Sequence, residues 1–338
     1  MSRPISVALV GIGGYGNTYV NALLDAPPEL RPTFNLVAVI DPNPAACRRL
    51  AELQSRDVPV HSSLESFYAS GQQAELVVLS TPIALHAPQT TLALSKGSHV
   101  LCEKPLCATL DDARRMLEAR DRFDRLVAIG YQWSFSPAIQ KLKGDILAGV
   151  FGRAKRLRTI VLWPRDEAYY GRNRWAGAKR DAHGNWVWDS PVNNACAHYL
   201  HNMLYMTGPR VDRSAAPATV VAELYRAHPI ENYDTGALRI TTADGVELLF
   251  IVSHATAERV DPTFSYEFER GTIEFAGIPD GRIVARMADG TIRNYGSPND
   301  RKEGKLFMTM DAIRTGQPTA CGIEAAAAHT LCAAAAQE

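Results

Sequence analysis

The sequence has 338 residues, and its 36 Lys and Arg residues balance 36 Asp and Glu residues, so the formal net charge is zero. This length exceeds what one hydrophobic core usually organises, and balanced charge without a basic run argues against nucleic-acid binding and favours a small-molecule partner. No apolar run reaches membrane-spanning length, and six cysteines scattered without a Cys-x-x-Cys pair indicate neither a disulfide framework nor a metal site.

The chain opens with a predicted strand, turn and helix in the order of a dinucleotide-binding fingerprint. The apolar run Ile5 to Val10 precedes a Gly-x-Gly-x-x-Gly loop, and a helix-compatible segment follows to about Leu24. Such glycines allow a tight turn and a close approach of backbone to a pyrophosphate at the helix N-terminus. The candidate cofactor ligands of the loop are Gly11, Gly13, Gly14, Tyr15 and Gly16. Because the first strand begins at Ile5, we expect no signal peptide and a cytoplasmic location.

A second predicted strand, Phe34 to Ile40, ends on Asp41. An acidic residue at this distance from a glycine loop accepts hydrogen bonds from a ribose 2′-hydroxyl and repels a 2′-phosphate. Asp41 therefore favours NAD over NADP, although Arg48 and Arg49 keep NADP as the alternative. The same aspartate could instead cap a helix that begins near Pro44.

Two further short strands end in polar motifs. Leu76 to Leu79 leads into a Thr-Pro turn, and His99 to Pro105 ends in a Glu-Lys-Pro tripeptide. Ligands bind beyond the carboxyl ends of strands in an open parallel sheet, so these ends are candidate cofactor contacts. The residues concerned are Thr81, Pro82, His86, Glu103 and Lys104. The alternatives are a His86 satisfied by backbone groups and a Lys104 that lies on the surface.

Strands and helices alternate as far as a last strand at Leu126 to Gly130. This order predicts a doubly wound parallel sheet, a Rossmann domain, in residues 1–130. Beyond it, all five tryptophans lie in one segment, where Tyr131, Trp133 and Trp163 are candidate substrate ligands. Aromatic faces stack on sugar rings, although core packing is the more frequent explanation. A polar loop from about Pro164 to Gly184 is long enough to cover a site.

Ser190-Pro191 and Gly208-Pro209 mark the ends of a predicted helix without Asp, Glu, Lys or Arg. One face of this helix is apolar. The other face carries Asn194, His198, His201 and Tyr205. A polar but uncharged stripe favours a pocket or a subunit contact over a face exposed to water. The four-residue spacing would place Asn194 beside His198, within hydrogen-bonding reach.

The remaining sequence predicts an open, largely antiparallel sheet with helices on one face. Its strand-like segments are Val220 to Tyr225, Ala237 to Thr242, Val246 to Ser253, Phe264 to Glu269, Thr272 to Phe275 and Ile283 to Met287. Asp-Gly pairs at 244, 280 and 289 favour type I′ hairpin turns. Two closing helices, about Gly304 to Thr315 and Gly322 to Ala335, carry no recognisable chemistry. The fold class is therefore α/β plus α+β, with the second domain in residues 131–338.

The glycine loop, the Thr-Pro turn, the Glu-Lys-Pro tripeptide and the helix with a histidine together resemble the Gfo/Idh/MocA oxidoreductases, such as glucose-fructose oxidoreductase and inositol dehydrogenase. The resemblance implies a catalytic Lys104 and places Thr81, Pro82 and His86 beside the nicotinamide ribose. It also aligns His198 with the histidine of an Asp-x-x-x-His pair. A homodimer or homotetramer formed through the second sheet is a further implication.

The sequence departs from the family pattern at four positions. Ile83 stands in place of an asparagine, and Ser134 stands where an arginine is frequent. Asn194 occupies the aspartate position of the pair, and His201 replaces a common later aspartate. The departure at Ser134 puts some of the family's substrate contacts in question.

We therefore expect an NAD-dependent oxidoreductase that transfers a hydride between a secondary alcohol of a sugar or cyclitol and nicotinamide. His198 would accept the hydroxyl proton and Lys104 would bind the same oxygen, with these roles open to exchange and Asn194 as the third catalytic candidate. The expected substrate ligands are Lys104, Tyr131, Trp133, Trp163, Asn194, His198 and His201. Two alternatives are a non-catalytic nucleotide-sensing regulator of the same fold and a glycosidase that recycles its NAD.

Overall fold

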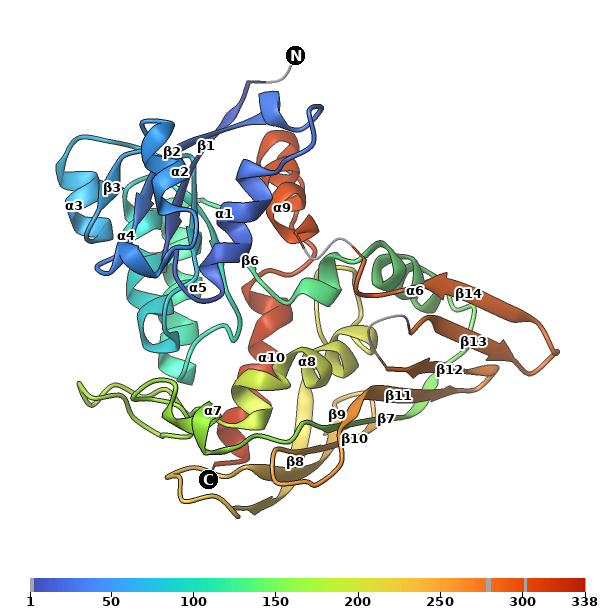
Figure 1. Ribbon diagram of the computed structural model, residues 1–338. Helices are drawn as coiled ribbons and strands as arrows, with labels where there is room; N and C mark the ends of the chain where they lie inside the picture. Colours follow the sequence, from blue (N-terminus) through green and yellow to red (C-terminus); the bar gives the residue numbers. More distant parts are fainter. Residues whose placement is uncertain (1–2, 278–280, 301–302, 338) are drawn as a thin grey trace. The chain divides into compact units, whose positions relative to one another are not determined.

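The computed structural model describes residues 3–277, 281–300 and 303–337 and divides into two compact units, which are treated separately below (Figure 1). The first unit comprises Met1–Leu106, Asp111–Gly130 and Glu303–Ile323. The second comprises Cys107–Leu110, Tyr131–Lys302 and Glu324–Glu338. A contiguous division near residue 130 stays a prediction, and the structure adds that a C-terminal segment belongs to the first unit.

The first unit contains a six-stranded parallel sheet in the described residues, with the order β3-β2-β1-β4-β5-β6. The strands are β1 (Ile5–Val10), β2 (Phe34–Ile40), β3 (Val60–His61), β4 (Leu76–Leu79), β5 (His99–Cys102) and β6 (Val127–Ile129). Strand β4 is buried along its whole length, as expected where helices cover both faces of a parallel sheet. The predicted Rossmann sheet is confirmed, and only the short β3 was not predicted.

Helices connect these strands and cover the sheet. They are α1 (Gly16–Leu24), α2 (Leu50–Ser55), α3 (Leu64–Ala69), α4 (His86–Ser95), α5 (Leu110–Phe123) and α9 (Gly304–Thr315). Helix α9 comes from the far end of the chain and contacts β5. The Phe307 ring of α9 lies 6.2 Å from the ring of Phe34, and the main-chain N–H of Ile129 donates to the Cys321 carbonyl at 2.8 Å. The C-terminal segment is thus an integral part of the first unit.

The second unit is built on an eight-stranded sheet in the described residues, with the order β14-β13-β12-β11-β7-β10-β9-β8. The strands are β7 (Ala154–Leu162), β8 (Pro217–Tyr225), β9 (Thr235–Thr242), β10 (Glu247–Ser253), β11 (Val260–Phe268), β12 (Gly271–Ala276), β13 (Ile283–Met287) and β14 (Ile292–Gly296). Only the β7–β10 pair is parallel among these pairings, so the predicted, largely antiparallel sheet is confirmed. Strands β7 and β14 were not predicted.

The hairpin turns differ from the prediction. Gly245 and Gly290 have φ angles of 81° and 86°, but Asp244 and Asp289 do not share the positive φ that a type I′ turn requires at both central residues. The predicted type I′ turns are therefore wrong at these two hairpins. The third pair, Asp280-Gly281, lies partly outside the described residues.

Helices of the second unit are α6 (Pro137–Leu147), α7 (Glu167–Gly171), α8 (Ala197–Met206) and α10 (Ile323–Ala335). Helix α8 contacts β7 and α6 contacts β14 (Figure 1). The opposite face of the sheet carries exposed side chains such as Val221 and Tyr225. The single helix predicted after Ser190 is wrong, because a π-helical turn at Pro191–Ala195 precedes α8 and Cys196 interrupts the helical path.

Candidate functional site

The glycine loop of the first unit joins β1 to α1 as the fingerprint requires. Gly11 has φ +78°, and a Cβ atom there would lie 2.5 Å from the main-chain oxygen of Ser80. A Cβ atom on Gly16 would lie 1.9 Å from the Gly11 oxygen. The loop therefore depends on the absence of side chains at both positions, and such a loop allows a phosphate group to approach the backbone closely.

Asp41 lies at the end of β2 and contacts this loop directly. Its Oδ2 atom accepts hydrogen bonds from the main-chain N–H groups of Ile12 at 2.9 Å and Gly13 at 3.3 Å, and its Oδ1 accepts from Asn43 at 2.8 Å. No side-chain cap to the short helical turn at Pro44–Ala46 is formed. Asp41 therefore braces the glycine loop, and its contact with a ribose stays a prediction.

His86 is buried and connects the two polar strand ends. Its Nδ1 lies 2.8 Å from the Pro105 oxygen and its Nε2 lies 3.0 Å from the Thr81 oxygen. Burial lowers the pKa of His86, so the ring is neutral and donates to one carbonyl at a time. The peptide bond between Lys104 and Pro105 is cis. His86 thus acts as an internal brace of the turn that carries Lys104, and Thr81 and Pro82 stay predicted cofactor contacts.

Glu103 is the centre of a buried polar cluster in the first unit. Its Oε1 accepts a 2.5 Å hydrogen bond from the Tyr19 hydroxyl and forms an ion pair with Lys305 of α9. Its Oε2 accepts from the main-chain N–H of Lys104 at 3.2 Å. The Lys305 ammonium also donates to the Tyr15 hydroxyl at 3.1 Å. The prediction that the closing helices carry no chemistry is therefore wrong for α9.

The second unit packs three histidines around Tyr131. The Tyr131 ring stacks on His201 at 3.9 Å and meets the edge of His198 at 5.8 Å. Its hydroxyl lies 2.9 Å from Nδ1 of His329 in α10, whose Nε2 lies 3.0 Å from the Val192 oxygen. Tyr131 is fully buried, so its side chain orients histidine rings rather than presenting a free face.

His201 and Ser134, two departures from the family pattern, contact each other. The Ser134 hydroxyl lies 2.9 Å from Nε2 of His201, and both side chains are buried. Burial holds the pKa of His201 well below its usual value, so the pair is neutral. The polar stripe was predicted to face a pocket or another subunit, but this part of it packs inside the second unit. A substrate contact by His201 stays a prediction that this burial does not support.

Asn194 lies in the π-helical turn and contacts an acidic residue. Its side-chain amide donates to Oδ1 of Asp189 at 2.7 Å, and Oδ2 of Asp189 accepts from the main-chain N–H of Gly177 at 2.7 Å. Because the helical path is interrupted at Cys196, the four-residue spacing no longer implies that Asn194 lies beside His198. Their predicted hydrogen bond stays a prediction.

The two candidate tryptophans have different surroundings. Trp133 is buried among Tyr199, Phe264 and Phe275, and its indole N–H donates to Asn299 at 3.0 Å. Trp133 therefore has the core-packing role that was the alternative to substrate binding. Trp163 is half-buried, and its indole N–H donates to the Asp261 carboxylate at 2.8 Å. A sugar contact stays a prediction for both residues.

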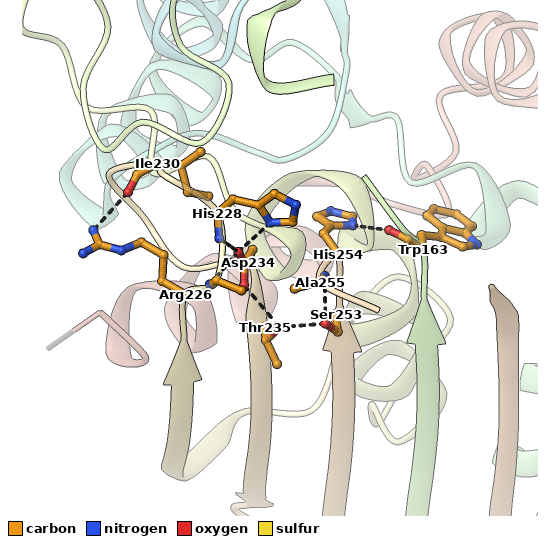
Figure 2. Close-up of polar contacts among 10 residues, drawn as sticks. Trp163, Arg226, His228, Ile230, Asp234, Thr235, Ser253, His254 and Ala255 are labelled. Carbon is orange, nitrogen blue, oxygen red and sulfur yellow. Dashed lines mark hydrogen bonds and ion pairs between the residues drawn. The ribbon is translucent and has the colours of Figure 1, made fainter. Parts of the chain in front are cut away.

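Figure 2 shows a network at the ends of β8, β9 and β10 that the sequence did not indicate. Asp234 accepts from the main-chain N–H and the Nδ1 of His228, both at 2.8 Å, while Nδ1 of His254 lies 2.9 Å from the Trp163 oxygen. Burial opposes ionisation of Asp234, but the His228 contacts hold the pKa of this carboxyl below its usual value. A pocket of about 560 Å³ lies beside His228 and is also lined by Tyr170.

Neither a metal nor a membrane-spanning segment is indicated by the part of the chain that the structure describes. Its His, Cys, Asp and Glu side chains form no group of three that could hold a metal ion. Its helices are too short or too polar to cross a bilayer.

The fold and the glycine loop define a class of two-unit proteins in which a Rossmann sheet precedes a second, largely antiparallel sheet. Residues 5–131 match the model of the Gfo/Idh/MocA family, described as an oxidoreductase family with an NAD-binding Rossmann fold. This match confirms the resemblance over this part of the chain. The family model does not extend over the second unit.

Curated relatives match a similar stretch. A 1-carboxy-3-chloro-3,4-dihydroxycyclohexa-1,5-diene dehydrogenase of Comamonas testosteroni is 31% identical over 160 residues, covering 45% of this chain and 37% of the relative. An inositol 2-dehydrogenase of Rubrobacter xylanophilus is 31% identical over 154 residues, covering 45% and 42%. The match thus spans less than half the length of each of these relatives.

Solved structures match the whole fold at low sequence identity. The WlbA dehydrogenase of Bordetella pertussis, in complex with NADH and UDP-GlcNAcA, has a TM-score of 0.79 at 24% identity, covering 99% of this chain and 97% of that one. An aldose-aldose oxidoreductase of Caulobacter crescentus, complexed with glycerol, has a TM-score of 0.79 at 18% identity, covering 99% and 98%. These similarities establish the fold of both units.

Sequence reasoning missed Lys305, His329 and the His228–Asp234 pair. Lys305 and His329 lie in C-terminal helices whose local sequence resembles ordinary packing helices. Their partners are 202 and 198 residues away in the chain, so no local pattern could have indicated them. The His228–Asp234 pair is local, and its six-residue separation could have been noted between two predicted strands.

Proposed function

We propose that the protein is an NAD-dependent dehydrogenase that oxidises a secondary alcohol of a sugar or cyclitol. The observation that carries this proposal is the end of β5, where Glu103 fixes the main chain of Lys104 within a family-matched, NAD-binding type of domain. Relatives named inositol 2-dehydrogenase and D-xylose 1-dehydrogenase support the substrate class.

In the proposed reaction, Lys104 binds the reacting oxygen and stabilises the negative charge that develops on it. His198 accepts the hydroxyl proton as general base. These two roles rest on the family resemblance, because the residues belong to different units. Bound NAD would accept the hydride. The side-chain-free loop around Gly11 and Gly16 fits the pyrophosphate of such a cofactor.

The choice of NAD over NADP is also part of the proposal. Asp41 presents a carboxylate at the end of β2, which repels a 2′-phosphate. Both η nitrogens of Arg49 form ion pairs at 2.7 Å, one with Asp25 and one with Glu52, so this guanidinium is less suited to bind a phosphate. Arg48 is exposed and keeps NADP as the alternative.

The decisive experiment is a screen of polyols and sugars for NADH formation, combined with identification of the nucleotide that copurifies with the protein. Steady NADH production with a polyol supports a dehydrogenase. Bound nucleotide without turnover would favour a nucleotide-sensing regulator. Cleavage of a glycoside without net NADH formation would favour an NAD-recycling glycosidase.

The assembly and location are proposed from the same resemblance. The exposed face of the second sheet, which includes Val221 and Tyr225, would be covered by another copy of the chain in a dimer or tetramer. Light scattering of the purified protein measures this directly, and a monomer at micromolar concentration would contradict it. A cytoplasmic location stays a prediction.

A further inference from the structure

Lys305 is 1% exposed and lies at the start of α9. Its ammonium forms an ion pair with Glu103 and donates to the Tyr15 hydroxyl at 3.1 Å and to the Gly130 oxygen at 3.4 Å. Burial lowers the pKa of Lys305, but the Glu103 carboxylate and Tyr15 outweigh it and raise this pKa above its usual value. The lysine is therefore charged and fully engaged inside the first unit.

The Glu103 carboxylate is enclosed as tightly as the lysine. A Cβ atom on Gly130 would lie 2.9 Å from Oε1 of Glu103, so the carboxylate packs against a position that only glycine allows. Tyr19 of α1 donates to the same oxygen at 2.5 Å, and the neighbouring Oε2 accepts from the Lys104 main chain. One carboxylate thereby joins the Glu-Lys-Pro turn to α1 and, through Lys305, to α9.

Two residues of this cluster, Tyr15 and Glu103, are predicted cofactor contacts. Tyr15 belongs to the glycine loop, and Glu103 immediately precedes Lys104. Tyr15 is 45% exposed, although its hydroxyl contacts the buried ammonium of Lys305. This contact fixes the Tyr15 ring at the surface of the loop. The lysine thus fixes two separate pieces of the candidate cofactor site.

We propose that Lys305 is a positioning residue for the cofactor site, holding the Glu103 carboxylate in place so that Tyr15 and the Lys104 main chain keep the geometry that binds the dinucleotide. This inference rests on the proposed function. Without the ammonium, Glu103 would be a buried carboxylate without a counter-ion, and it would either take up a proton or turn away from its present partners. Both outcomes would disturb Tyr15 and Lys104 together.

The test measures NADH affinity by fluorescence titration without substrate, so that it does not depend on turnover. The variants are Lys305→Met and the double variant Glu103→Gln/Lys305→Met, in which a neutral amide replaces the carboxylate and no unpaired charge remains. The matched control is Lys143→Met, which removes another fully buried lysine whose ammonium contacts main-chain oxygens within the second unit. Circular dichroism confirms that each variant is folded.

We expect Lys305→Met to weaken NADH binding about tenfold or more. The double variant should bind NADH more tightly than Lys305→Met but less tightly than the native protein, because Tyr15 still lacks its contact with the ammonium. Lys143→Met should bind NADH normally. A folded Lys305→Met protein with native affinity, or a double variant as weak as the single one, would overturn the proposal. If Lys305→Met does not fold, Lys305→Gln takes its place under the same criteria. A native protein that binds neither NADH nor NADPH would instead refute the proposed function itself.

Discussion

The side-chain amide of Asn194 donates a 2.7 Å hydrogen bond to the carboxylate of Asp189. The sequence lacks the aspartate that the family resemblance places at position 194, yet a buried carboxylate lies within hydrogen-bonding distance of that position. Asp189 is also held by the Gly177 main chain, so it cannot turn freely. Asp189 therefore places a carboxylate next to the position where the resemblance expects an aspartate.

This placement makes a prediction about Asn194→Asp. The new carboxyl would lie next to Asp189, and two adjacent carboxylates share a proton because their like charges repel. We expect the single variant to shift the acidic limb of the rate profile only slightly. The exchange variant Asp189→Asn/Asn194→Asp tests the predicted contact between residue 194 and His198. A carboxylate beside His198 would stabilise its protonated form and move the limb to higher pH. The measurement is turnover as a function of pH for the native protein and both variants. An acidic limb at the same pH in all three proteins would show that the charge of residue 194 does not affect the general base.

Replacement of Lys104 tests the proposed reaction. Lys104→Ala should lower turnover by on the order of a hundredfold or more, because its ammonium stabilises charge at the reacting oxygen. Glu103 binds the main chain of residue 104, which alanine retains, so NADH affinity should stay nearly unchanged. Steady-state kinetics and NADH titration measure the two effects separately. Near-normal turnover would remove Lys104 from the mechanism.

Asp41 should determine the cofactor preference. Asp41→Ser should reduce the preference for NADH over NADPH, because it removes the charge that repels a 2′-phosphate. The substitution should also lower the affinity for both cofactors, because Asp41 accepts hydrogen bonds from Ile12 and Gly13 in the loop. Asp41→Asn keeps an acceptor for these amides and serves as the control. A native protein that binds NADPH more tightly than NADH would contradict this use of Asp41.

The Ser134–His201 contact predicts that these two positions are energetically coupled. Ser134→Arg alone places a guanidinium beside a buried neutral ring and should cost roughly 3 kcal/mol or more, as for an unpaired buried charge. The double variant Ser134→Arg/His201→Asp forms an ion pair and should be more stable than the single arginine variant. Urea denaturation gives both free energies of unfolding. A double variant less stable than Ser134→Arg would show that the positions do not compensate each other.

His254 should make the stability of the protein depend on pH. Burial lowers the pKa of His254 to about 4, whereas an unfolded histidine titrates near ~6.5. The unfolded state then binds more protons between these values, so the contribution is present above pH 6.5 and is lost as the pH falls toward 4. This contribution amounts to about 3 kcal/mol.

The measurement compares the native protein with His254→Asn, which keeps a donor for the Trp163 oxygen but does not titrate. The difference in their free energies of unfolding should narrow as the pH falls from 6.5 to 4. Parallel slopes for the native and His254→Asn proteins would show that folding does not lower the pKa of His254.

Local sequence patterns predicted the features that depend on neighbouring residues in the chain. Hydrophobic runs, glycine spacing and Asp-Gly pairs predicted the Rossmann strands and most of the second sheet, because strands and turns follow local pattern. The Glu-Lys-Pro tripeptide could be placed at a strand end for the same reason. The short β3 and the strands β7 and β14 were missed, since their sequences are polar or interrupted and only pairing with neighbours makes them strands.

The contacts between polar groups that are far apart in the chain became visible in the folded structure. Lys305 pairs with Glu103, and His329 with Tyr131, across about 200 residues of chain, and such pairs leave no periodic trace. The uncharged face of α8 is a second example. The partner of its His201 is Ser134, which lies on another element and could not be identified from the helical pattern. Whether a buried polar side chain belongs to a site or to a core depends on the group that satisfies it, and chain folding alone brings that group into contact.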